Sequence, residues 1–432
     1  MVNVIGVFDD MKINTDQKDT LYLFLLQSMN YAIPLVLIPY LMIKLGVESY
    51  GLIGFSTAII QFLILFVDFG FNMGGTKRIA INKDDKKVLS HIFFSTVYAK
   101  VILLSLSLVV FLAVYNIPRF YEYQLALLCT LPMLIGNTFT FTWFYQGIGK
   151  IRYLSLLSMA CRVLILPLTF YFVQAPEDYI YAISINSTVY IFVALISILW
   201  ILKNKLLVFE NVKFSDVLQE LKESFPFFLS IASISLYTQL FVVVLGVFTN
   251  PAIVGIYTAA EKIIRTVSLL FYTPISQVYY PKIAYMTSID RGVALKLIYR
   301  VANFTLILMI IISISLFIFS NFIESIIGKD YQGINMLVQI LCLVPFLSAV
   351  GGVAGQMGLI AYIDNIYARK VFQNIYIVAG VFAVFQVSIL TYFYKEIGTT
   401  FALLLTEFLV AVLMIYYFIK FLKVEKKSET PI

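Results

Sequence analysis

Charged side chains occur in the middle of long apolar stretches of this sequence, where spanning helices usually avoid them. The clearest case is residues 253–276, an apolar segment long enough to cross a bilayer that carries Glu261, Lys262 and Arg265 near its middle. A charge at the bilayer centre costs about 2.5–3.5 kcal/mol on insertion scales, so such residues face a protein interior or a water-filled cavity. Glu261 and Arg265 are four residues apart and can partly neutralise each other on one helix face. Lys262 has no such local partner, so it either reaches the membrane surface, pairs with another helix, or binds an anionic ligand.

Two more bases lie inside other apolar segments, and basic side chains outnumber acidic ones at this depth. A rise of 1.5 Å per residue puts the bases about 12–18 Å from one membrane surface, the cytoplasmic surface for Lys100 and Arg162 and the outer surface for Lys262 and Arg265. All four therefore lie close to the middle of a hydrocarbon core about 30 Å thick. The four bases are Lys100, Arg162, Lys262 and Arg265, and the acids are Glu261, Glu407 and, nearer a segment end, Asp68. The excess of positive charge favours a cavity for an anion, and the Arg162 guanidinium matches phosphate oxygens best. The alternative is that these side chains lie on different helix faces and never meet.

Composition predicts an all-α polytopic membrane protein. The chain has 432 residues, of which 61% are hydrophobic and only 13% are charged, whereas a soluble globular protein is about 25% charged. Apolar runs of about 20 residues, each long enough to cross a bilayer, recur along the whole chain. We predict twelve spanning helices, at 20–43, 51–72, 91–115, 123–146, 154–174, 179–202, 225–248, 253–276, 298–320, 334–361, 371–394 and 399–420.

Basic residues set the predicted orientation in the membrane. The set of connections that includes both termini holds 23 of the 31 Lys and Arg residues, and the other set holds four. Both termini are therefore expected in the cytoplasm, and the net charge of +7 reflects orientation rather than nucleic-acid binding. The longest cytoplasmic connection divides the chain into two sets of six helices. The predicted units are a cytoplasmic segment 1–19, a bundle 20–202, a linker 203–224 with a short amphipathic surface helix, a bundle 225–422 and a cytoplasmic tail 423–432.

Several kinds of functional site are not supported by the sequence. The three cysteines lie far apart in apolar segments, and the single histidine, His91, lies at a helix entrance, so neither a disulfide framework nor a metal site is expected. Gly149-Lys150 and Gly328-Lys329 lack the flanking residues of a phosphate-binding loop. No long loop is available to house a glycosyl-transfer site. We therefore expect a transporter without a cofactor rather than an enzyme.

Short motifs spread along the chain resemble a known transporter family. They are Asn30-Tyr31 with Pro34, Pro39-Tyr40 and Leu45-Gly46; Asp68-Phe69-Gly70-Phe71-Asn72 running on to Lys77-Arg78; Trp143-Phe144-Tyr145-Gln146-Gly147; and Ala260-Glu261-Lys262-Ile263 running on to Tyr280-Pro281-Lys282. Their order and position are similar to those of the polysaccharide transporter family, specifically the O-antigen repeat-unit flippases (Wzx type) of the multidrug/oligosaccharidyl-lipid/polysaccharide (MOP) flippase superfamily. Met73-Gly74-Gly75 departs mildly from the family pattern.

The resemblance implies an architecture and an activity. The architecture is twelve transmembrane helices in two six-helix bundles around a central cavity. The activity is movement of undecaprenyl-diphosphate-linked oligosaccharide from the cytoplasmic to the outer leaflet of the bacterial inner membrane, for O-antigen or a related surface polysaccharide. The partners implied are this lipid-linked substrate, membrane lipid, and the polymerase and chain-length regulator of the same pathway.

Roles for the buried charges follow from this expectation. Lys100, Arg162, Lys262 and Arg265 would hold the diphosphate while the prenyl tail stays in lipid, and Glu261 would position Arg265. Glu407 or Asp68 could instead couple transport to protons or sodium, and the sequence leaves this open. One alternative is a multidrug exporter of the same superfamily, which suits cationic drugs and unpaired intramembrane acids. Another is a membrane-embedded polysaccharide polymerase, for which the long basic outer loop is missing.

Overall fold

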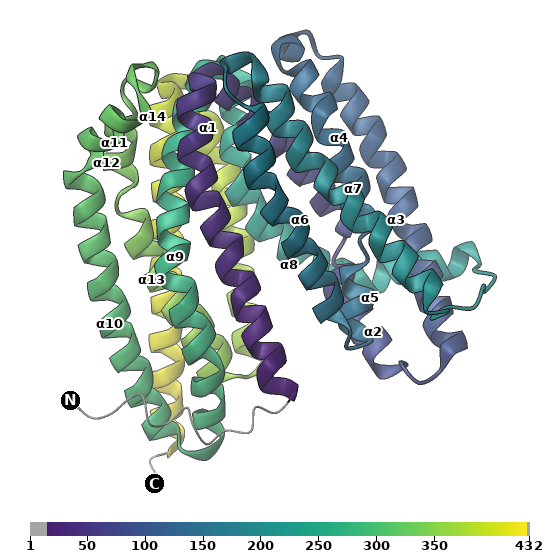
Figure 1. Cartoon of the computed structure of the whole chain (residues 1–432). Coiled ribbons are helices and arrows are strands. Elements are labelled where there is room, and N and C mark those ends of the chain that lie inside the picture. Colours follow the sequence, from purple (N-terminus) through teal and green to yellow (C-terminus); the bar gives the residue numbers. More distant parts are fainter. Residues whose placement is uncertain (1–14, 430–432) are drawn as a thin grey trace.

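The computed structural model is helical over nearly the whole of the described chain, and its described residues form no strand (Figure 1). It describes the backbone of residues 15–429, and the side chains of residues 33–424 except 230, 234, 236 and 237. The helices are α1 (Thr15–Asp68), α2 (Phe71–Ile81), α3 (Lys86–Tyr115), α4 (Gln124–Thr138), α5 (Thr142–Gly147), α6 (Ile151–Phe172), α7 (Tyr179–Lys203), α8 (Phe214–Phe248), α9 (Pro251–Ile289), α10 (Arg291–Ile318), α11 (Ser320–Ile327), α12 (Ile334–Leu341), α13 (Val344–Gly352) and α14 (Ile366–Glu429). Short 3-10 turns precede α4, α7 and α12, and a π-helix spans Val353–Ile363. The predicted all-α fold is confirmed.

Two of the helices each supply two passes across the molecule. The backbone of α1 leaves the helical region at Gly46, and that of α14 leaves it at Lys395. Pro34 and Thr57 flank the Gly46 break and line one cavity, so the chain reverses there. Counting both limbs of α1 and α14 gives the twelve passes that the sequence predicts. Six of the described passes are each apolar enough to span a membrane: α3, α6, α7, α10, the segment Pro118–Gly147 and the segment Ile334–Ile363. The segments Ile33–Ile81 and Ile366–Val424, each tested as a whole, are also apolar enough, as are the two limbs of α8 taken together.

Three predicted boundaries differ from the structure. The surface helix expected in the 203–224 linker is instead the start of α8, which begins at Phe214 and bends by 63° between its Phe214–Ser233 and Thr238–Phe248 limbs. The eighth pass continues to Ile289 as part of α9 instead of ending near residue 276. The tenth pass is not one helix but α12, α13 and the π-helix in series.

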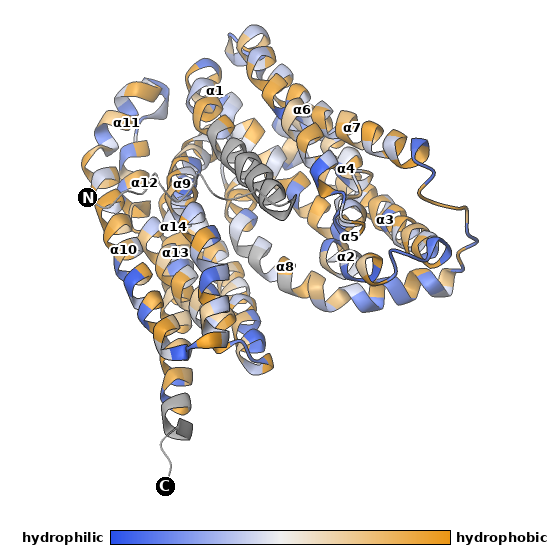
Figure 2. Cartoon of the chain, turned by 60° about the horizontal axis from the view of Figure 1, so that its bottom comes forward, coloured by the Kyte–Doolittle hydropathy of each residue, from blue (hydrophilic) through white to orange (hydrophobic). Residues whose placement is uncertain are grey.

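The first and second halves of the chain form two groups of helices with shared elements between them. Helices α3, α4, α6 and α7 pack together, and α9, α10, α12, α13 and α14 pack together, while α1 and α8 contact members of both groups. Helix α1 begins and α14 ends at the same end of the molecule (Figure 1). The helices are predominantly hydrophobic along their lengths, and hydrophilic residues gather at several helix ends and connections (Figure 2). That distribution fits a chain surrounded by lipid.

At the end opposite the chain termini, α1 and α9 approach so closely that only glycine fits. A Cβ atom at Gly51 would lie 1.8 Å from the Pro251 carbonyl oxygen, and one at Gly255 would lie 1.9 Å from the Val47 carbonyl oxygen. Close approach through small residues is the usual way for membrane helices to gain packing contacts, because lipid supplies no hydrophobic drive between them. The contact fixes the walls of the space beneath it.

The motifs near residues 70 and 143 pack against each other at the other end of the first group. A Cβ atom at Gly75 would lie 3.0 Å from the Trp143 ring, and Thr76 donates a hydrogen bond to the Trp143 carbonyl oxygen at 3.1 Å. Gly70 adopts a left-handed turn (φ 77°) against the backbone of Phe228 in α8. The Met73-Gly74-Gly75 departure therefore places a glycine where the indole ring leaves no room for a side chain.

Candidate functional site

A central cavity of about 660 Å³ lies between α1, α7, α8 and α9. This volume is within the range of about 300–1,000 Å³ typical of ligand sites. Its charged lining comes from the middle of α9, where Glu261, Lys262 and Arg265 occupy one and a half turns. The uncharged polar lining includes Thr57, Asn186 and residues of α8 and α9. Gly51 and Gly54 let α1 lie close to α9 beside this cavity.

Arg265 lies between two carboxylates from different helices. Its Nε–H donates to Glu261 Oε1 at 2.7 Å, and its Nη1 lies 3.9 Å from Glu407 Oε1 on α14. Ser348 of α13 donates its hydroxyl to Glu407 Oε2 at 2.9 Å. Glu261 and Glu407 are both buried. Buried charges need partners of this kind to offset their desolvation, and the arginine fork can serve more than one oxygen.

Lys262 differs from its neighbour in having no carboxylate partner among the side chains that the structure describes. It is exposed, and it lines the central cavity rather than the outer surface of α9. It lies about 17 Å along the helix from Pro251, roughly half the thickness of a bilayer core. A lysine ammonium in a cavity at this depth attracts an anion, because the low-dielectric surroundings screen its charge less than bulk water does.

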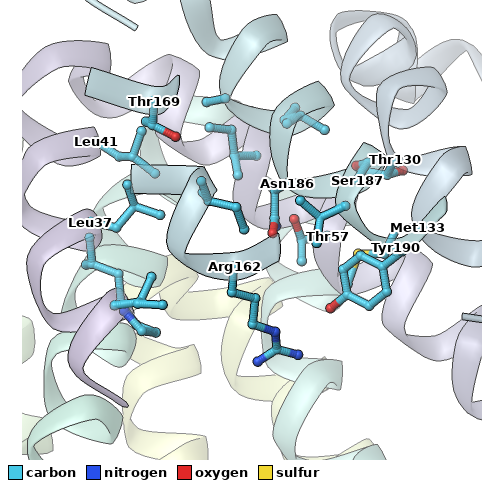
Figure 3. A pocket seen from close by; sticks show the side chains of 18 residues that line it. Leu37, Leu41, Thr57, Thr130, Met133, Arg162, Thr169, Asn186, Ser187 and Tyr190 are labelled. Carbon is cyan, nitrogen blue, oxygen red and sulfur yellow. The ribbon is translucent and has the colours of Figure 1, made fainter. Parts of the chain in front are cut away.

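A second compartment of about 240 Å³ adjoins the first, between α1, α4, α6 and α7 (Figure 3). Its only charged lining residue among those described is Arg162 of α6, and the other polar residues are uncharged. Six residues line both spaces: Pro34, Ile38, Leu41, Ile53, Thr57 and Asn186. Arg162 and the bases of α9 therefore line two neighbouring spaces that share these six residues.

Lys100 and Asp68 lie apart from these spaces. Lys100 Nζ donates to Asp68 Oδ1 at 2.9 Å, and the Asn137 side chain donates to Asp68 Oδ2 at 3.2 Å. Lys100 is 2% exposed and lines neither cavity. The structure thus brings Lys262 and Arg265 to one cavity, with Glu261 and Glu407 beside Arg265, and places Arg162 in the adjoining compartment. Lys100 and Asp68 form an ion pair with each other, at the junction of α1, α3 and α4.

Comparison with known proteins identifies the family. Residues 17–287, more than half of the chain, match the family described as "Polysaccharide biosynthesis protein". The chain belongs to the polysaccharide biosynthesis protein family. One family relative, from Escherichia coli (strain K12), is named "Putative O-antigen transporter" and is 29% identical over 403 residues, covering 93% of this chain and 96% of the relative.

Solved structures of MOP-type transporters have the same fold as this family member. The lipid II flippase MurJ in an inward closed conformation matches with a TM-score of 0.71, covering 96% of this chain and 93% of its own. An inward-facing multidrug resistance MATE family transporter of the MOP superfamily matches with a TM-score of 0.70, covering 94% and 96%. Both are 14% identical to this chain. At this identity the matches establish the fold but do not identify the substrate.

Some residues of interest in this polysaccharide biosynthesis protein were not predicted. Thr57 and Asn186 line both spaces, and their only sequence signal is an isolated uncharged polar residue within an apolar pass. Arg78 pairs with Glu220, and also with Glu223 at 2.9 Å, which ties α2 to the start of α8. The positive-inside pattern explained Arg78 as an orientation signal, and nothing in the local sequence points to partners 142 and 145 residues away.

Among the described residues, no three His, Cys, Asp or Glu side chains gather closely enough to hold a metal ion. His91 instead contacts Asp216 at 3.1 Å, so the single histidine contributes to the docking of α8 on α3. The chemistry that the cavity offers is binding by fixed positive charge and by uncharged polar groups. It suits movement of a ligand rather than its covalent change.

Proposed function

We propose that this protein is a flippase for undecaprenyl-diphosphate-linked oligosaccharide repeat units. It takes the substrate from the cytoplasmic leaflet of the bacterial inner membrane and releases it to the outer leaflet, for O-antigen or related surface polysaccharide synthesis. Family membership, the relative named for O-antigen transport and the MurJ-like fold support this proposal. The pathway's polymerase and chain-length regulator are the proposed partners of the released unit.

The observation that carries the proposal is Lys262 in the cavity. A diphosphate bears negative charge that must be matched inside the membrane, and an ammonium without a described carboxylate partner supplies the match. Arg265 lines the same cavity, Arg162 lines the neighbouring compartment, and both can add guanidinium donors. The prenyl tail remains in lipid, and the sugars and diphosphate move through the cavity by alternating access of its two ends. Lys100 contributes by holding Asp68 rather than through direct contact with the diphosphate.

Orientation and ion coupling belong to the same proposal. The excess of Lys and Arg on the connections at the terminal end supports cytoplasmic termini. The Gly51–Gly255 contact then closes the outer end of the cavity. Proton or sodium coupling, if the protein uses it, would involve Glu407, which is buried and contacts Ser348 and the cavity-lining Arg265.

The cavity argues against export of cationic drugs, the alternative that the MATE-like fold raises. Such export is served by intramembrane acids without partners. Here Glu261 and Glu407 both lie beside Arg265, and Asp68 lies beside Lys100. The described cavity therefore presents no unpaired carboxylate to a cation, while Lys262 is available to an anion.

Replacing the cavity lysine tests the proposal. In a strain whose own flippase is deleted and whose surface glycan depends on this protein, Lys262→Gln is expected to lower export at least tenfold. One lost hydrogen bond to a charged group costs about 1.5–3 kcal/mol, or roughly a tenfold to hundredfold loss. Lys262→Arg keeps the charge and should retain part of the activity. Export is measured as surface glycan, together with single repeat units stranded on the cytoplasmic leaflet.

The matched control is Lys296→Gln, which removes an exposed lysine at the start of α10, away from the cavity. Its export should equal that of the wild type, and all variants are compared at equal protein level in the membrane. Normal export by Lys262→Gln would remove the anion-binding role of the cavity. Accumulation of unpolymerised units on the outer leaflet would instead indicate a polymerase defect.

A further inference from the structure

The smaller compartment has a chemistry that diphosphate binding does not use. Beyond Arg162, its described polar lining is uncharged and comes from four helices: Thr57 of α1, Thr130 of α4, Thr169 of α6, and Asn186, Ser187 and Tyr190 of α7. Its apolar lining, including Leu37, Leu41 and Met133, fills the gaps between these groups (Figure 3). A site of this composition binds through hydrogen bonds and shape rather than through charge.

Two of these polar side chains stand at the boundary with the central cavity. Thr57 and Asn186 line both spaces, and they lie close to each other in Figure 3. Within the described part of the chain, neither side chain uses its polar atoms in a hydrogen bond, whereas the Thr130 hydroxyl donates to the Leu127 carbonyl oxygen at 2.6 Å. Asn186 is exposed to the cavity and Thr57 is half-buried. Their donors and acceptors are therefore available to a ligand.

The free groups match a sugar better than a lipid tail. A carboxamide offers an acceptor oxygen and two N–H donors, and a hydroxyl donates and accepts, which is the pattern that neutral sugar hydroxyls present in return. A prenyl chain in this compartment would bury the Asn186 and Thr57 polar atoms without partners, at a cost in binding. The compartment also adjoins the part of the cavity that contains Lys262. A molecule that carries a sugar next to a diphosphate could place the diphosphate at Lys262 and the sugar in the uncharged polar compartment.

We propose that Asn186 and Thr57 form a sugar subsite, which binds the sugar attached directly to the diphosphate and discriminates among lipid-linked sugars. The assignment rests on the proposed function, since it takes the diphosphate to lie at Lys262. Tyr190 lines the same compartment and adds a phenol hydroxyl to its polar groups. Discrimination follows because a sugar lacking a matching hydroxyl leaves the carboxamide unpaired.

Binding measurements with paired probes test the assignment. The full-length protein in lipid nanodiscs is titrated with a short-chain prenyl diphosphate and with the same prenyl diphosphate carrying one sugar: N-acetylglucosamine, N-acetylgalactosamine, glucose or galactose. The wild type is expected to bind at least one sugar-bearing probe more tightly than the bare diphosphate. The measured quantity is the ratio of the affinity for the sugar-bearing probe to the affinity for the bare diphosphate. Asn186→Leu and the nearly isosteric Thr57→Val should each reduce this ratio by roughly threefold to tenfold, which corresponds to the loss of one to two hydrogen bonds, and should leave the affinity for the bare probe unchanged.

Two controls separate this result from a fold defect and from phosphate binding. Thr188→Leu changes an exposed residue two positions along α7, on a different face from Asn186, and should leave both affinities unchanged. Lys262→Gln should weaken both probes and leave their ratio intact. A ratio unchanged in Asn186→Leu and Thr57→Val, an equal weakening of both probes, or a wild type that binds no sugar-bearing probe more tightly would overturn the subsite. Failure of every probe to bind the wild type would overturn the proposed function and the subsite with it.

Discussion

At the scale of single residues, the two lysines within apolar passes differ in what surrounds them: Lys262 is exposed to the cavity, whereas Lys100 is buried against Asp68. Removing Lys100 alone leaves the Asp68 carboxylate with a hydrogen bond from Asn137 but without the positive charge that balances it. Lys100→Met is expected to destabilise the protein by about 3–5 kcal/mol, the usual cost of breaking a buried pair from one side. Lys100→Met/Asp68→Asn removes both charges and should recover most of that loss. Thermal unfolding of the purified protein in detergent measures the difference.

Export by the double variant decides the role of Lys100. If Lys100 only stabilises the fold, the double variant should regain export together with stability. Stable double-variant protein that exports nothing would show that Lys100 contacts the substrate directly, as the sequence first indicated. Lys262→Gln serves as the reference, because its loss of export is expected without a loss of stability.

The sequence identifies these charges and their depth but not their partners. The pairing of Glu261 with Arg265 could be predicted from the sequence, because a spacing of four residues puts both side chains on one helix face. The structure contains that ion pair. The pairing of Lys100 with Asp68, or of Arg265 with Glu407, joins residues 32 and 142 positions apart. Such pairings depend on the relative rotation of helices, which no local pattern encodes. Thr57 and Asn186 escaped notice for the same reason, since only neighbouring helices make them cavity residues.

At the scale of helices, the contact between α1 and α9 limits what can stand at residues 51 and 255. A methyl group on Gly255 would meet the Val47 carbonyl oxygen, and backbone cannot move aside as a flexible side chain can. Gly255→Ala is expected to shift the protein toward a state in which this end is open, by about 1–3 kcal/mol, the typical cost of overpacking. Such a shift corresponds to roughly a 5–150-fold change in the equilibrium between the two states.

Cross-linking measures this opening. A cysteine pair is placed across α1 and α9 near Val47 and Pro251, after Cys129, Cys161 and Cys342 are replaced by serine or alanine. Its cross-linking yield should fall in Gly255→Ala. Gly351→Ala is the matched control, because a Cβ atom there meets its nearest neighbour at an ordinary 3.5 Å. An unchanged yield in Gly255→Ala would mean that the contact is not closed in the membrane.

Helix lengths show where sequence patterns fail at this scale. The start of α8 was predicted as a separate surface helix, because polar residues around Ser215 and Lys222 interrupt the hydropathy. In the structure this stretch is the first limb of α8, bent by 63° from the second limb, and it is held against α2 and α3 by contacts of Glu220 and Glu223 with Arg78 and of Asp216 with His91. The number and order of passes follow from apolar runs alone. The place of a polar stretch such as this one depends on ion pairs with distant helices.

At the scale of the whole molecule, charge sets both orientation and driving force. The terminal end carries most of the Lys and Arg residues, and in the orientation that we propose it faces the negative, cytoplasmic side of an energised membrane. A diphosphate moving outward then moves down the electrical gradient, gaining about 2.3 kcal/mol per charge per 100 mV if the charge crosses the full field. That gain equals roughly a fiftyfold bias per charge.

Membrane potential should therefore control the direction of transport. In proteoliposomes with a potassium gradient and valinomycin, a potential that is negative on the cytoplasmic side of the protein is expected to speed release of a short-chain prenyl-diphosphate sugar on the other side, and the reversed potential should slow it. Lys262→Gln should transport slowly at every potential, because the anion no longer enters the cavity. Transport that ignores the potential and follows an imposed proton or sodium gradient would assign the driving force to an ion instead, and Glu407, with Ser348 and Arg265 around it, is where that ion would act.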